Sequence, residues 1–108
     1  MRRANVYCRS VLAGTLCKDE EAGRYRFQYA PEYLRDPKNP AISLSFPKRE
    51  AGFESPVLFP FFFGLLAEGD NKALQCRVLK IDESDHFTRL LKTCAAETIG
   101  GITVAEVS

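Results

Sequence analysis

The stretch from Leu58 to Gly69 constrains the fold of this chain more than any other. Its sequence is LFPFFFGLLAEG, and it holds four of the eight phenylalanines. Proline is tolerated at the first position of a helix, where its missing N–H leaves no helical hydrogen bond unmade, and glycine readily ends a helix in the left-handed conformation. The stretch therefore predicts a helix that begins at Pro60 and ends at Gly69.

This predicted helix is apolar on two sides. The first apolar face, with residues at i, i+3, i+4 and i+7, is Phe59, Phe62, Phe63 and Leu66, and the second is Leu58, Phe61 and Leu65. Burying one phenylalanine contributes about 1.5–3 kcal/mol, so a second face left in water would forgo a large share of a typical total stability of about 5–15 kcal/mol. The second face must be covered by the rest of this chain or by a partner protein.

The length and charge of the chain limit the classes of protein to which it can belong. A chain of 108 residues is long enough for a core of its own, and we expect one domain over residues 1–108. The formal net charge of +1 leaves no basic excess to attract nucleic acid or an anionic membrane. No apolar run approaches the ~20 residues that span a bilayer, and none follows the basic N-terminus as in a signal peptide. We therefore expect a cytoplasmic protein that binds neither nucleic acid nor membranes.

The cysteines favour a reduced protein without a metal. The four thiols lack a Cys-x-x-Cys spacing and lie in apolar segments, which is typical of buried, reduced cysteines; they are Cys8, Cys17, Cys76 and Cys94. A zinc site would have to combine them with the single histidine, His86, and no close-spaced ligand pair is present. Neither a disulfide framework nor a metal site is expected.

The segments before the phenylalanine-rich stretch are patterned as strands. A hairpin is predicted over residues 5–16, with its turn at Arg9-Ser10 and with Gly14 at a bulge or a close approach of the backbone. The clearest strand is 24–29, in which the aromatic side chains share one face; they are Tyr25, Phe27 and Tyr29. An antiparallel sheet can bury one face and expose the other, so this aromatic face is the expected floor for the phenylalanine-rich helix.

The next segments complete the predicted fold. Period-two alternation predicts a strand at 42–46, and residues 48–54 read as a charged loop. A helix over 70–81 is expected to be capped by Asp70 or Asn71, and its apolar stripe is Leu74, Val78 and Ile81. A further helix follows Ser84-Asp85, and its apolar face is Phe87, Leu90, Leu91 and Cys94.

A last strand is predicted at 102–107, so the order is strands, then helices, then a strand. This order predicts an α+β domain, a mostly antiparallel sheet with about three helices packed on one face. The two amphipathic helices are expected to cover the second phenylalanine face, which would make the phenylalanines mainly core and leave the turn after them exposed.

Groups suited to catalysis are sparse. The one acidic cluster with a histidine is Asp82, Glu83, Asp85 and His86, and consecutive positions at a helix start point in different directions, so capping is the favoured interpretation. Gly100-Gly101 leads into a strand, whereas a phosphate-binding loop opens a helix. We predict no enzymatic activity and no cofactor. An independent enzyme or small-molecule binder built on the acidic cluster is the alternative.

Five segments resemble, in order and spacing, the N-terminal domain of HipA-type serine/threonine kinases, the toxins of bacterial toxin–antitoxin systems. They are residues 13–16 (AGTL), 25–34 (YRFQYAPEYL), 42–47 (ISLSFP), 61–69 (FFFGLLAEG) and 98–104 (TIGGITV). In these kinases the domain precedes a catalytic region, which does not follow here before Ser108. The chain is therefore similar to the stand-alone HipS proteins of three-part HipB–HipS–HipT systems.

The resemblance implies an antitoxin-like protein without catalysis of its own. Its expected partner is a separately encoded HipA-like or HipT-like kinase, which it binds and restrains, in a complex with a HipB-like helix-turn-helix repressor. The alternative is a structural subunit that completes the kinase, or bridges it to the repressor, without inhibiting it.

The resemblance also points to the end of the phenylalanine-rich stretch. In the family this segment commonly ends Leu-Leu-Pro-Glu-Gly followed by an aromatic residue, whereas here Ala67 replaces the proline and Asp70 stands at the aromatic position. Insertion of a bulky ring into a partner is therefore not expected. Asp70 either approaches a basic or metal-binding site of the kinase or only caps the next helix. The predicted partner-binding residues are Leu66, Glu68, Gly69, Asp70 and Asn71.

Overall fold

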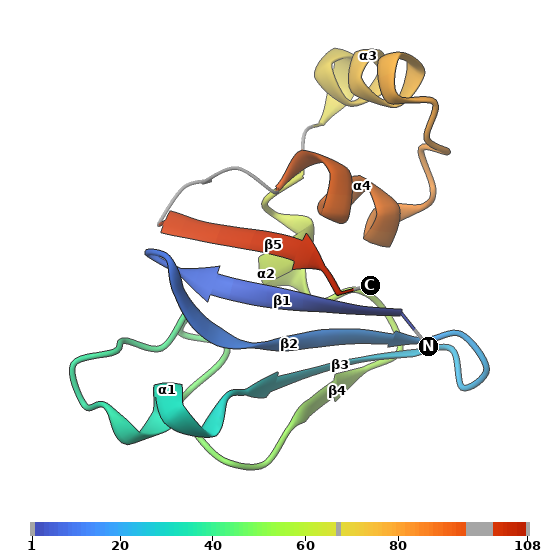
Figure 1. The fold of residues 1–108 in the computed structure, drawn as a ribbon. Coiled ribbons are helices and arrows are strands. Elements are labelled where there is room, and N and C mark those ends of the chain that lie inside the picture. Colours follow the sequence, from blue (N-terminus) through green and yellow to red (C-terminus); the bar gives the residue numbers. More distant parts are fainter. Residues whose placement is uncertain (1, 67, 95–100, 108) are drawn as a thin grey trace.

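The computed structural model describes residues 2–66, 68–94 and 101–107. Its elements are β1 (Arg2–Cys8), β2 (Val11–Asp19), β3 (Arg24–Tyr29), α1 (Pro31–Arg35), β4 (Phe53–Ser55), α2 (Pro60–Phe63), α3 (Gly69–Leu79), α4 (His86–Thr93) and β5 (Ile102–Glu106). The strands form one antiparallel sheet in the order β4-β3-β2-β1-β5. Helices α2 and α4 lie against one face of this sheet (Figure 1). The predicted α+β class and antiparallel sheet are confirmed.

The first hairpin forms where it was predicted. Arg9 and Ser10 both adopt left-handed backbone angles, with φ of 51° and 68°, as a two-residue turn that matches the twist of its strands requires. The pairing of β1 with β2 shifts beside Gly14, and Ala13 is the extra residue of the bulge. A Cβ atom on Gly14 would lie 2.3 Å from the carbonyl oxygen of Gln28. Both expectations for Gly14, a bulge and a close approach, are therefore confirmed.

The aromatic face of β3 is the floor of the core. Phe27 and Tyr29 are buried, while the residues that alternate with them are exposed. The ring of Phe27 lies 5.8 Å from that of Phe62 in α2, measured between centroids. The predicted packing of the phenylalanine-rich segment on this face is confirmed, because period-two alternation places every second side chain of the strand on one side.

The predicted strand at 42–46 is wrong. Residues Ser43 to Phe46 form a tight turn in which the Phe46 N–H donates to the Ser43 carbonyl at 3.0 Å. The buried Tyr29 hydroxyl holds both sides of this turn: it accepts from the Ile42 N–H at 3.0 Å and donates to the Phe46 carbonyl. The fourth strand is β4 instead, in which Phe53 pairs with Phe27; the predicted charged loop therefore ends in a strand.

Helix α2 begins at Pro60 as predicted but is shorter than expected. It ends at Phe63, and Gly64 follows as its C-cap. Gly69 does not end this helix; with a φ of 61° it begins α3. Phe59 and Phe62 are buried, whereas Phe63 is 40% exposed. One turn of helix suffices because the aromatic rings of the sheet and of the 43–46 turn already surround Phe62.

The last two helices differ in how well they follow the prediction. In α4 the Asp85 side chain accepts from the Thr88 N–H, so this residue is the predicted N-cap, and Phe87, Leu90 and Leu91 are buried. Helix α3 begins at the N-cap Glu68, without a side-chain cap, so Asp70 lies inside its first turn and not at the cap position. No helix in the described parts of the chain is long and apolar enough to cross a membrane.

The predicted internal stripe of α3 is wrong. Leu74 and Val78 are 54% and 69% exposed, and Figure 1 shows α3 beyond α4, at a distance from the sheet. Helix α2 is short, and its buried ring Phe62 packs against the sheet and the 43–46 turn, so α3 is not needed to cover it. Helix α3 therefore directs apolar side chains to solvent.

Candidate functional site

The acidic cluster before α4 is used for capping. The Asp82 carboxylate accepts from the backbone N–H and the hydroxyl of Ser84, at 2.8 and 2.7 Å. The Asp85 carboxylate accepts from the N–H and hydroxyl of Thr88, at 3.1 and 2.8 Å. The hydroxyl and N–H of Ser84 lower the pKa of Asp82, because they stabilise its charged form. Both carboxylates are therefore used in local structure: Asp85 caps α4, as predicted, and Asp82 holds the loop before it.

His86 joins α4 to α2. Its Nδ1 atom accepts from the Arg89 guanidinium at 2.9 Å, and its ring meets the ring of Phe63 edge-on, with centroids 5.0 Å apart. Since arginine only donates, the imidazole is neutral and carries its proton on Nε2. Partial burial lowers the pKa of His86, and the charges of Arg89 and Lys72 lower it further, against the opposite effect of Asp85. The role of this histidine is structural.

Acidification is expected to weaken the fold through His86. Because its pKa is lower in the folded state, the unfolded chain binds the proton more readily, so stability is complete above about pH 6.5 and declines as the pH falls below that value. His86 is the only histidine, so His86→Gln should flatten this dependence between pH 7.5 and 5. Urea midpoints of both proteins across this range check the prediction. An equal decline in both would show that His86 is not the source.

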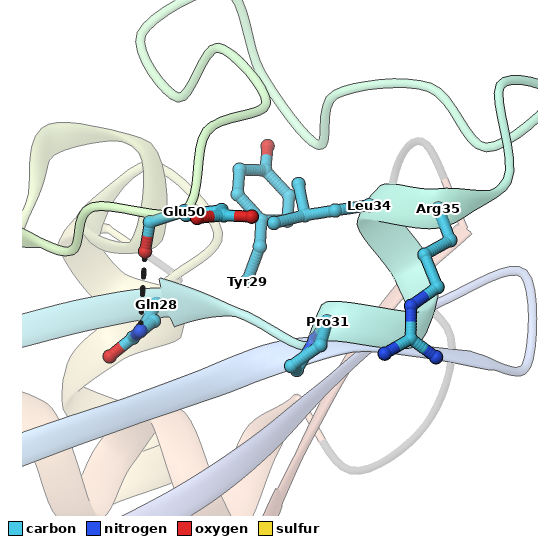
Figure 2. Close-up of a pocket in the computed structure, with 6 residues that line it drawn as sticks. All are labelled: Gln28, Tyr29, Pro31, Leu34, Arg35 and Glu50. Carbon is cyan, nitrogen blue, oxygen red and sulfur yellow. Dashed lines mark hydrogen bonds between the residues drawn. The ribbon is translucent and has the colours of Figure 1, made fainter.

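A hollow of about 390 Å³ beside α1 offers no catalytic site. Its walls are Gln28, Tyr29, Pro31, Leu34, Arg35 and Glu50. Figure 2 shows the Gln28 side chain donating a hydrogen bond to the Glu50 carbonyl at one side of the hollow. Arg35 lies at the opposite side, and its guanidinium is directed away from Glu50. The Tyr29 hydroxyl is already bonded to the 43–46 turn. The polar groups do not converge on a common point, as a catalytic site requires.

The thiols also lack the arrangement of a metal site. All four cysteines are free; Cys8, Cys76 and Cys94 are buried, as predicted, and Cys17 is half-buried. Within residues 2–66, 68–94 and 101–107, no three His, Cys, Asp or Glu side chains lie close enough to share a metal ion. Burial raises the pKa of Cys94, which keeps this thiol protonated and unreactive at neutral pH.

The structure divides the predicted partner-binding residues into two groups. Leu66 is buried in the core, 6% exposed. Glu68, Gly69, Asp70 and Asn71 are exposed and together form the N-cap and first turn of α3. Leu66 therefore positions the chain as it enters this turn, and the other four residues present a surface.

This surface extends along α3 to residues that sequence reasoning had assigned to the core. Asp70, Leu74 and Val78 are spaced by four, so they lie on one side of the helix, and Asn71 adjoins them. We call Asp70, Asn71, Leu74 and Val78 the α3 face. The spacing identified Leu74 and Val78 as a stripe but could not show that it faces solvent. The α3 face thus combines two exposed apolar side chains with two polar residues at its start.

Comparison with known proteins identifies the family. The family model described as the HipA N-terminal domain matches residues 4–105. An uncharacterised protein of Haemophilus influenzae is 33% identical over 106 residues, which cover 98% of this chain and 93% of that protein. A solved structure, the N-terminal domain of HipA toxin, superposes with a TM-score of 0.71 at 29% identity, covering 100% of this chain and 94% of that one.

Together, the sheet, its two packed helices and the projecting α3 define a small α+β domain. The chain belongs to the HipA N-terminal domain family. The part of HipA that it matches is the N-terminal domain and not the kinase catalytic domain.

Proposed function

We propose that this chain is an antitoxin-like regulator that binds a separately encoded HipA-like kinase and restrains it, in a cytoplasmic complex with a helix-turn-helix repressor. Membership of the HipA N-terminal domain family supports an association with a kinase of the HipA type. The Haemophilus relative adds support for a free-standing role, because this domain accounts for 93% of that protein.

The observation that carries the proposal is the α3 face. Leu74 and Val78 are more than half exposed although they are apolar, and a helix that places such residues in water gains by docking them into a groove. The exposed Glu68-to-Asn71 turn lies at the start of the same helix. The proposed contact residues are therefore Glu68, Gly69 and the α3 face, with Leu66 fixing the turn from beneath.

The proposed mode of restraint is contact rather than chemistry. In the acidic cluster, Asp82 is bonded to Ser84 in the loop, Asp85 caps α4, and His86 contacts Arg89 and Phe63. At the start of α3, an exposed carboxylate at Asp70 can meet a basic or metal-binding group of the kinase without a bulky ring entering it. A hydrophobic contact at Leu74 and Val78 would supply most of the affinity, since exposed charge pairs contribute little.

A retention experiment tests the proposal. The chain is co-expressed with a tagged, separately encoded HipA-like kinase, and we expect the kinase to retain it. The double variant Leu74→Asp/Val78→Asp should weaken retention at least tenfold, because it places charge where an apolar groove is expected, at a cost of about 1.4 kcal/mol or more in binding. Both side chains are exposed, so the thermal midpoint of the free chain should hardly change.

The matched control is Val11→Asp/Leu12→Asp. These apolar residues begin β2, next to the first hairpin turn, and are 45% and 41% exposed, so the control adds the same charge at a similar exposure away from α3. It should bind the kinase as the wild type does. A stable chain that the kinase does not retain, or equal losses in both double variants, would contradict the proposal. Rescue of growth from the kinase without the repressor then separates inhibition from a purely structural role.

A further inference from the structure

Helix α3 has little tertiary support. Its eleven residues bury one side chain, Cys76, whereas the eight residues of α4 bury four. In proteins most of the stability of a helix comes from packing one face against the rest of the molecule, and an isolated helix shorter than about 12–15 residues is marginal in water. Unfolding α3 would expose little further apolar surface, because Leu74, Val78 and Leu79 are already 54%, 69% and 45% exposed.

The first turn of α3 also lacks local support. The N-cap Glu68 makes no side-chain hydrogen bond to the helix, and residues 69–71 are Gly-Asp-Asn, three residue types of low helix propensity. The backbone bond from the Lys72 N–H to the Glu68 carbonyl is long, at 3.4 Å. The charge of Asp70 favours a helix start, but it does not take the place of a capping hydrogen bond. In α4, by contrast, the Asp85 carboxylate accepts from the first turn.

The C-terminal end of α3 is better held. The Ile81 N–H donates to the Cys76 carbonyl at 2.8 Å, and the buried Cys76 lies on this side of the helix. The C-cap is Lys80, in the left-handed conformation with a φ of 57°, which glycine adopts with less strain than lysine. Unfolding of α3 is therefore expected to begin at its N-terminal end, where the exposed residues 68–71 lie.

We propose that α3 is partly unfolded in the free chain and that the kinase completes the helix by binding its folded form. This inference rests on the proposed function, because the partner and the α3 face are the same. Asp70, Leu74 and Val78 share one side only while the segment is helical, so the kinase selects that state. The apparent dissociation constant is then the intrinsic value divided by the helical fraction. Residues of α3 that never touch the kinase therefore control its affinity.

Hydrogen exchange of the chain, alone and with the kinase, tests the proposal, with α4 as the internal reference. In the free chain, the amides of α3 should be protected at least about tenfold less than those of α4, and the kinase should raise their protection at least about tenfold. An α3 as well protected as α4 in the free chain, or left unprotected in the complex, would overturn this proposal while the proposed function stands. A chain that the kinase does not retain would contradict both.

Two variants outside the α3 face should change the helical fraction in opposite directions. Ala73 lines a hollow with Cys76; glycine there lowers the helix–coil equilibrium constant about fivefold, so Ala73→Gly should weaken kinase binding about three- to fivefold.

Lys80→Gly relieves the left-handed C-cap and should raise the protection of α3 and strengthen kinase binding about twofold. Its control is Lys80→Ala, which removes the same charge but keeps a side chain in the left-handed conformation, and so should gain nothing. Equal binding by the wild type, Ala73→Gly and Lys80→Gly would mean that α3 is fully formed before the kinase binds, and would overturn the proposal.

Discussion

Replacing Phe62 by alanine is expected to lower the free energy of unfolding by about 3–5 kcal/mol, the cost of removing a large side chain from a closed core. Phe62 is 0% exposed. Its ring centroid lies 5.8 Å from that of Phe27, 5.7 Å from that of Phe46 and 5.2 Å from that of Phe61. A cavity at this point would remove contacts with the sheet, the 43–46 turn and α2 together. Denaturant unfolding measures the loss.

The matched control is Phe63→Ala, one position further along α2. Phe63 is 40% exposed, and its ring contact is the edge-on pair with His86. An aromatic pair contributes about 0.5–1.5 kcal/mol, so this variant should lose much less stability than Phe62→Ala. Equal losses would mean that α2 is rotated relative to the orientation described above.

Replacing Gly14 by alanine is the second change with a large expected effect. The new Cβ would lie 2.3 Å from the carbonyl oxygen of Gln28 and 3.0 Å from a ring carbon of Phe27. A backbone oxygen has no rotamer with which to move away, so β2 and β3 must separate locally. We expect a loss at or above the upper end of the about 1–3 kcal/mol that overpacking costs. Hydrogen exchange should show weaker protection of the β2–β3 amides.

Gly23→Ala provides the control for this change. Gly23 lies in the turn between β2 and β3 with a φ of 65°, and no atom lies within 4 Å of a Cβ built there. Alanine should cost only the left-handed strain of about 1–2 kcal/mol, and the β2–β3 amides should keep their protection. A loss of protection in both variants would indicate that general strain, not a clash at Gly14, opens the sheet.

The core that these variants probe is complete without α3. Phe62 is enclosed by the sheet, the 43–46 turn and α2, and the apolar face of α4 closes the same side of the sheet. Because α3 contributes little to this core, its sequence is under weak constraint from folding. Exposed leucine and valine at positions 74 and 78 are then better explained by binding than by stability, which agrees with the proposed function.

Several elements could be predicted from local pattern. The Arg9-Ser10 turn, the alternation of β3 and the Asp85 cap of α4 all depend on neighbours a few residues apart, and the structure confirms each. The exposure of residues 68–71 was also predicted, although from the expectation that the sheet and two helices would cover both phenylalanine faces. Such features can be predicted from sequence because their physical causes are local. These causes are the backbone angle, the alternation of side chains and hydrogen bonds to the nearest turn.

Other features depend on contacts that no local pattern encodes. The alternating residues 42–46 suit a strand, but the buried hydroxyl of Tyr29 bonds Ile42 and Phe46 and bends the segment into the turn that exposes Leu44. The stripe at Leu74 and Val78 suits an internal helix, but the core around Phe62 closes without α3, and both side chains are exposed. The α3 face arises where the tertiary structure overrode a pattern that sequence reasoning assigned to the core.

By itself, the amino-acid sequence determined the α+β class, the aromatic floor of the sheet, the start of α2 at Pro60 and the resemblance to the HipA N-terminal domain. These follow from which residues are apolar and how they are spaced. Only the tertiary structure decided where α2 ends and which apolar side chains remain in water. Both outcomes depend on how much of each apolar face is buried by the other elements. This burial comes from contacts between residues far apart in the sequence, which the spacing of apolar residues does not reveal.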